Sequence, residues 1–149
     1  MQVCMNGHRI TQFAASEPET RKKFCKECGA KSIDACEACG AHIEVTHNNR
    51  FVMSHKVPKY CSGCGAPFPW QTAALESLKE ILRESELSAD ELEEAAKVMP
   101  DMMQDTPKTE SASLKMKRLL GKAGKPAYDV AIKVISDIAS ETAKKTMGI

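Results

Sequence analysis

The stretch Cys25-Lys26-Glu27-Cys28-Gly29-Ala30 occurs twice more along the chain, as Cys36-Glu37-Ala38-Cys39-Gly40-Ala41 and Cys61-Ser62-Gly63-Cys64-Gly65-Ala66. In each copy, two thiolates separated by two residues can bind one metal ion. The glycine after the second cysteine suits the tight turn that points backbone N–H groups at the sulfur atoms. The repeated stretch is therefore typical of a zinc knuckle, and it decides how the first half of the chain folds.

Two tetrahedral metal sites need eight ligands, whereas three knuckles supply six. The missing pair lies in Cys4-Met5-Asn6-Gly7-His8, and its use accounts for all seven cysteines of the chain. We therefore predict two structural zinc ions. Pairing the knuckles in chain order assigns the first ion to Cys4, His8, Cys25 and Cys28, and the second to Cys36, Cys39, Cys61 and Cys64.

This assignment has alternatives. The spacing from Cys4 to His8 is wider than in the knuckles, and His8 could instead be a surface histidine. The second and third cysteine pairs could share one ion, but only seven residues separate Cys28 from Cys36, which is short for the hairpin that brings two knuckles face to face. Iron could occupy the all-cysteine site, as in rubredoxin, although zinc is favoured. The remaining histidines, interpreted as solvated side chains, are His42, His47 and His55.

The charge of the chain is nearly balanced but unevenly distributed. A net charge of +1 over 149 residues argues against a strongly basic nucleic-acid-binding protein. Residues 71–110 contain four basic and eleven acidic side chains, whereas residues 111–149 contain eight and three. The sequence shows no signal peptide and no membrane-spanning apolar run, and seven cysteines fit a disulfide framework poorly. We expect a cytoplasmic protein without a membrane span.

The residue patterns predict an α+β protein with a double zinc ribbon in residues 1–70 and an α-helical tail domain in residues 71–149. In the ribbon region, strands are expected over residues 9–13, 41–45 and 51–53, with a turn at 47–50. Phe68 and Trp70 lie in a proline-rich junction and are expected to pack between the last ribbon and the first helix.

About four helices are expected in the tail domain. Pro100 should stop the second helix and Gly121 the third, while the last should extend to about Met147. The four starting points are a cap at Thr72, the capping box Ser88-Ala89-Asp90-Glu91, the pair Thr106-Pro107, and Pro126.

A larger set of residues follows a recognisable order: Cys4, Gly7, His8, Cys25, Cys28, Cys36, Cys39, Tyr60, Cys61, Cys64, Pro67, Phe68, Pro69 and Trp70. This layout resembles the bacterial double zinc ribbons, in particular an uncharacterised bacterial family described as a domain of unknown function. The family joins a Cys-x-x-Gly-His-like start to Cys-x-x-Cys-Gly knuckles and a Pro-Phe-Pro-Trp segment. The resemblance implies zinc and a ribbon fold but no particular activity, and it covers the helical tail only loosely.

The motifs favour a protein that is not an enzyme. The sequence contains no His-Glu-x-x-His, no phosphate-binding Gly-Lys-Ser/Thr loop and no Gly-x-Ser-x-Gly elbow. Four protein ligands leave no open position on either metal, and no cysteine remains as a nucleophile. An enzyme of unfamiliar type is therefore the weakest of three hypotheses.

The favoured hypothesis is a zinc-binding adaptor or protein-interaction protein, with the ribbons as a platform and the C-terminal helices as a docking surface. A protein partner or a second copy is expected on the helix predicted over residues 126–147, because its apolar residues cover more than one face. The alternative is a zinc ribbon protein that binds nucleic acid through the ribbons and the basic segment 115–122. Without such a role, this segment is interpreted as the solvated face of an amphipathic helix.

Overall fold

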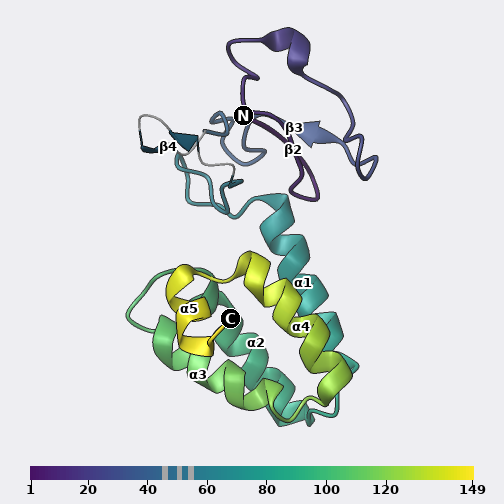
Figure 1. Ribbon diagram of the computed structural model, residues 1–149, viewed down its shortest axis with the longest axis vertical. Coiled ribbons are helices and arrows are strands. Elements are labelled where there is room, and N and C mark those ends of the chain that lie inside the picture. The colour runs from purple at the N-terminus through teal and green to yellow at the C-terminus, as the bar shows by residue number, and fades with distance from the viewer. Residues whose placement is uncertain (45–46, 50–51, 54–55) are drawn as a thin grey trace. The chain divides into compact units, whose positions relative to one another are not determined.

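The structure, a computed structural model, describes residues 1–44, 47–49, 52–53 and 56–149 (Figure 1). The chain divides into two compact units, Met1–Ala73 and Ala74–Ile149. Short strands and both cysteine clusters belong to the first unit, and the second is helical. The predicted α+β fold, with metal-binding ribbons followed by helices, is therefore confirmed, although the described residues form five helices where about four were expected.

A small antiparallel sheet forms the centre of the first unit. Its middle strand β1 (Gln2–Cys4) pairs with β2 (Arg9–Thr11) on one side and β3 (Ser32–Ile33) on the other. The whole of β1 is buried, so that Cys4 enters the first cluster from an enclosed strand. A single 3-10 turn, η1 (Pro18–Thr20), lies in the loop between β2 and β3.

The second hairpin differs from the sequence expectation. β4 (His47–Asn49) pairs antiparallel with β5 (Val52–Met53), so the turn predicted at 47–50 is wrong for the three residues of β4. Asparagine is common in turns, but here the pairing of His47 with Met53 places the asparagines in a strand. The parts of the prediction that involve residues 45, 46, 50, 51, 54 and 55 lie outside the described residues.

Two other strand predictions were too long. β2 covers residues 9–11 of the predicted 9–13, and residues 41–44 contribute one isolated bridge, between His42 and Ala35, in place of a strand. The buried Ile43 donates its backbone N–H to the carbonyl oxygen of Asp34 at 2.9 Å. This segment is therefore fixed by burial of a single side chain and not by a continuous ladder.

The aromatic junction packs within the first unit. The rings of Phe68 and Trp70 stack with centroids 4.7 Å apart and an interplanar angle of 15°. The indole Nε1 of Trp70 donates to the carbonyl oxygen of Pro58 at 2.9 Å. The first helix begins earlier than predicted, at Pro69, because proline is favoured in the first helical turn, where its missing N–H needs no partner.

The rest of the first helix, from Ala74, and the helices after it form the second unit around a core of buried apolar side chains, to which the first helix contributes Leu78 and Leu82. The capping box is confirmed: the Glu91 backbone N–H donates to Ser88 Oγ, and the Ser88 N–H donates to a carboxylate oxygen of Glu91. None of the helices in the described part of the chain is long and apolar enough to cross a membrane. The helices are α1 (Pro69–Arg83), α2 (Ala89–Met103), α3 (Thr109–Leu120), α4 (Lys125–Ile138) and α5 (Glu141–Met147).

Three helix boundaries correct the sequence predictions. Pro100 lies inside α2, which continues because Met102 and Met103 are buried in the core. α3 begins at Thr109 and not at Pro107, because the buried Thr109 hydroxyl closes the preceding turn by donating to the Gln104 carbonyl at 2.6 Å. The helix predicted over 126–147 is broken at Ser140, whose hydroxyl accepts from the Ala143 N–H and caps α5.

Candidate metal centres

The eight predicted ligands lie in two clusters, grouped as the sequence analysis paired them. In each cluster the four ligand atoms all lie within 4.8 Å of one another. Two ligands of each cluster are buried and two are exposed, so each cluster lies at the surface with one protected side. The clusters are Cys4, His8, Cys25 and Cys28, and Cys36, Cys39, Cys61 and Cys64.

The three knuckles share one backbone geometry. In the first, the Cys25 N–H donates to the Ala30 carbonyl at 2.9 Å, and the Gly29 N–H donates back to the Cys25 carbonyl at 2.8 Å. Gly29 has a φ of 69°, a conformation that glycine adopts without steric cost. The equivalent bonds in the other two knuckles have lengths of 2.8 to 2.9 Å. The repeated sequence thus builds a repeated loop that presents two sulfurs on one side.

The Cys4 turn is a shorter version of the same loop. Its bonds run from the Cys4 N–H to the His8 carbonyl and from the Gly7 N–H to the Cys4 carbonyl, both at 2.9 Å. Gly7 stands three residues after the first ligand, whereas the knuckle glycine stands four residues after it. The longer imidazole of His8 then reaches the position that a second cysteine holds in the knuckles.

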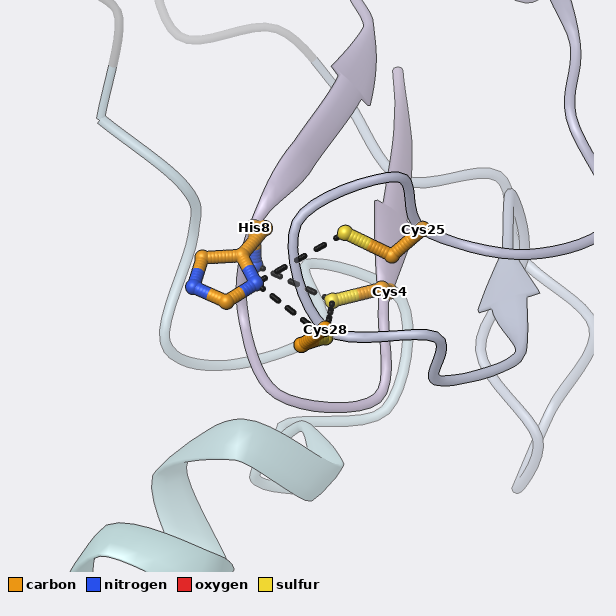
Figure 2. Close-up of side chains that lie close together, drawn as sticks. All are labelled: Cys4, His8, Cys25 and Cys28. Carbon is orange, nitrogen blue, oxygen red and sulfur yellow. Dashed lines mark hydrogen bonds between the residues drawn. The ribbon is translucent and has the colours of Figure 1, made fainter.

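Figure 2 shows the His8 ring with Nδ1 turned toward the sulfur atoms of the first cluster. This nitrogen lies 3.3 Å from Cys28 Sγ and 3.7 Å from Cys25 Sγ, while the Sγ atoms of Cys4 and Cys28 are 3.8 Å apart. The structure therefore places His8 with the cysteines, and not as an isolated surface histidine. His42, in contrast, is exposed and joins neither cluster.

The second cluster has the same spacing between its sulfurs. Cys36 Sγ lies 3.8 Å from Cys64 Sγ, and Cys39 Sγ lies 3.6 Å from Cys61 Sγ. The two knuckles approach so closely that a Cβ on Gly63 would lie 2.9 Å from the Cβ of Ala41. A side chain at position 63 would therefore push the knuckles apart. The sequence analysis did not single out this glycine, since its need appears only when the two loops meet.

The electrostatics of each cluster favour thiolate at one position. In the first, the backbone N–H of Ala30 together with His8 and Asn6 lowers the pKa of Cys28 to about 6. In the second, the backbone N–H groups of Gly63 and Cys64 lower the pKa of Cys61 to about 7. A thiolate near neutral pH is the form that binds a metal ion.

Other thiols in the clusters are held protonated by their surroundings. The N–H of Ala41 favours the Cys39 thiolate, but the adjacent sulfurs of Cys64 and Cys61 outweigh it and raise the pKa of Cys39 to about 12. Burial raises the pKa of Cys4. Crowded sulfurs repel one another as thiolates, and a dication at the centre is the group that would remove this repulsion.

The donor sets fit a tetrahedral metal ion. Four sulfurs placed ~2.3 Å from a common centre are ~3.8 Å apart, which matches the measured sulfur–sulfur distances. Additional N–H groups face the sulfurs: the His8 backbone N–H donates to Cys4 Sγ and the Asn6 side-chain amide to Cys28 Sγ. Such outer donors orient metal ligands, and Asn6 was missed by the sequence analysis because one amide in a turn carries no distinctive signal.

Comparison with known proteins supports the bacterial family indicated by the sequence. A family model described as "Uncharacterized protein conserved in bacteria (DUF2321)" matches residues 1–147. No curated protein and no solved structure matches the chain. Because the family model covers both the cysteine clusters and the five helices, the chain belongs to the DUF2321 family.

Proposed function

We propose that the protein is a zinc-binding interaction module without catalytic activity. The observation that carries this proposal is the closure of both clusters: each brings four sulfur or imidazole donors within 4.8 Å of one another. Thiolate and imidazole donors in tetrahedral arrangement suit Zn²⁺, and a site with four protein ligands has a structural role because it lacks a position for substrate. The metal would supply folding free energy to a unit whose sheet has strands of only two or three residues.

Metal analysis of the purified full-length chain tests the zinc sites. We expect two zinc ions per chain, falling to one in Cys25→Ser/Cys28→Ser and to one in Cys36→Ser/Cys39→Ser. The matched control is Lys26→Ser, which changes an exposed residue inside a knuckle without removing a ligand. One metal or none in the unmodified protein, or a different metal after expression in zinc-replete medium, would contradict the proposal.

We further propose that the partner surface is the side of α4 that carries Val130 and Val134. The α4 residues Ala131, Ile135 and Ile138 are buried in the helical core. Val130 is 48% exposed, and Val134, one turn further along the same side of the helix, is only partly buried. Apolar side chains that are accessible and adjacent to one another on a surface are typical of interaction sites. A second copy or another protein could cover them.

The alternative, nucleic-acid binding through segment 115–122, has less support. Arg118 donates to both carboxylate oxygens of Glu94, at 2.8 and 2.9 Å, and Lys122 pairs with Glu91 at 2.6 Å. These contacts occupy two of the cations that would have to face phosphate groups. The segment is better explained as the solvated face of α3, which its acidic neighbours on α2 partly neutralise.

A further inference from the structure

A cavity of about 520 Å³ lies in the first unit, beside the first cluster. This volume is within the usual range for ligand sites. Of the lining residues among those described, four are basic and one is acidic. Phe24 and Ile10 add apolar surface, and the basic side chains belong to Arg9, Lys22, Lys23 and Lys26.

Phe24 is exposed although it immediately precedes a metal ligand. Its side chain is 63% exposed. Its backbone is held by an antiparallel bridge to Lys31, with Cys25 donating to the Ala30 carbonyl on one side and Ser32 donating to the Lys23 carbonyl at 3.0 Å on the other. An aromatic ring on a fixed backbone, facing a cavity and water, is a ready stacking surface.

The lysine charges beside Phe24 remain available for a ligand. Lys22 and Lys23 are exposed, and neither forms a salt bridge within the described part of the chain. Lys26 pairs with Glu27 only at 3.6 Å, in an exposed pair of little strength. A metal-loaded cluster of three cysteines and one histidine would carry one negative charge, which leaves the lining with a net positive charge.

The backbone beside Phe24 has few groups left for a peptide. The Lys22 N–H donates to the Gln2 side-chain oxygen at 2.9 Å, and the Lys22 carbonyl accepts from the Gln2 amide at 3.0 Å. The Lys23 carbonyl already accepts from the Ser32 N–H, and the Cys25 N–H donates to the Ala30 carbonyl. The wall thus offers cations and a ring, not the ladder of free N–H and C=O groups on which an added β-strand depends.

We propose that this pocket binds single-stranded nucleic acid, with a base stacked on Phe24 and the neighbouring phosphates paired with the lysines. Aromatic stacking next to a positive groove is the arrangement that binds single strands without strong sequence preference. This function goes beyond the proposed zinc-binding and protein-interaction roles and uses side chains that neither of them requires.

Fluorescence anisotropy with labelled oligothymidylate and oligouridylate of about fifteen nucleotides tests the proposal on the full-length, metal-loaded protein. We expect binding that weakens as salt rises, about tenfold weaker binding for Phe24→Ala, and retained binding for Phe24→Trp. Lys22→Glu/Lys23→Glu should weaken binding by about tenfold or more and flatten the salt dependence. If Phe24→Ala disturbs the adjacent metal site, the result for the Lys22→Glu/Lys23→Glu variant decides whether the pocket binds the oligonucleotide.

Lys115→Glu/Lys117→Glu is the matched control, because it reverses two exposed charges on α3 that are not among the residues lining this cavity. It should change affinity by less than about twofold. Absence of oligonucleotide binding at low salt, or equal loss in this control, would overturn the proposal. So would tighter binding of poly-L-glutamate than of either oligonucleotide, which would indicate an acidic protein partner. The metal stoichiometry is measured in a separate experiment, so absence of oligonucleotide binding would not contradict the proposed zinc sites.

Discussion

Gly7 lies against Trp70 so closely that a Cβ on the glycine would be 3.1 Å from the Cβ of the tryptophan. Gly7 also has a φ of 87°, a value that other L-residues rarely adopt. The contact joins the turn of the first cluster to the aromatic junction, where Trp70 is already held by its bond to Pro58. The position of the turn that carries Cys4 and His8 is thus coupled to packing of the only tryptophan in the chain.

Gly7→Ala should destabilise the first unit by more than backbone strain alone. The strain costs about 1–2 kcal/mol, and crowding against Trp70 adds to it. The control is Gly29→Ala, which has a φ of 69° but no atom within 4 Å of the added Cβ. Chemical unfolding followed by tryptophan emission should show a larger loss and an altered native spectrum only for Gly7→Ala. Equal losses with unchanged spectra would show that the Trp70 contact is unimportant.

His8→Ala should weaken the binding of one of the two metal ions and leave the binding of the other unchanged. Removal of a ligand should reduce affinity by more than the ~10–100-fold that loss of an outer-shell partner costs. His42→Ala, which alters an exposed histidine outside both clusters, should have no effect. Competition with a chromogenic chelator measures both variants. Two tightly bound ions in His8→Ala would remove His8 from the ligand set.

The ligand pairing was accessible from the sequence because it depends on local geometry. Two cysteines separated by two residues, followed by glycine, form the same loop wherever they occur, as the matching bonds of Cys25, Cys36 and Cys61 show. The capping box at Ser88 was accessible for the same reason, since all of its bonds lie within four residues.

The missed boundaries depend on contacts that are distant in sequence. Pro100 normally ends a helix, but burial of Met102 and Met103 outweighs the lost backbone bond. The break at Ser140 is fixed by its backbone N–H, which donates to the Met102 carbonyl at 2.9 Å. Neither contact has a local signature. The pattern of apolar residues alone therefore predicted one continuous helix over residues 126–147 and a second helix that stopped at Pro100.

The helical unit should keep its structure when the metal is removed. It contains no ligand of either cluster, and its core is built from its own helices. After chelation, far-UV circular dichroism should retain the helical signal while tryptophan emission shifts. The comparison variant Leu119→Ala removes a fully buried side chain and should cost about 2–5 kcal/mol of helical stability without changing metal content. Simultaneous loss of zinc and helix would show that the helices depend on the ribbons.

Glu91 should make the helical unit sensitive to acid. A hydrogen bond from Lys122, followed by bonds from Ser88, lowers the Glu91 pKa from its ordinary value of 4.5 to about 2. A depressed carboxyl pKa stabilises the fold above about pH 4.5 and ceases to do so as pH falls toward 2. Glu91→Gln should therefore lower the melting temperature at neutral pH. The difference in melting temperature between the variant and the wild type should shrink as the pH falls from about 4.5 to about 2.

This measurement is made in chelator, so that acid-driven metal release does not contribute. Glu93→Gln is the control, since Glu93 pairs with Lys97 on its own helix at 2.6 Å and should matter less. A Glu91→Gln effect that is independent of pH would assign the loss to the capping geometry and not to the charge.

The exposed side of α4 gives the last prediction. Val130→Glu should leave the fold intact, because Val130 is 48% exposed and a charge there stays hydrated, but it should abolish self-association or partner capture if this side is the docking surface. Val134 is partly buried and packs on the core, so Val134→Glu should lower the stability of the helical unit to some extent. Ile135→Glu buries an unpaired charge at a position with no exposure and should cost roughly 3 kcal/mol or more. Light scattering and a melting curve on the same samples separate docking from packing, and a folded Val130→Glu variant with unchanged mass and unchanged partner binding would exclude this side of α4 as the interface.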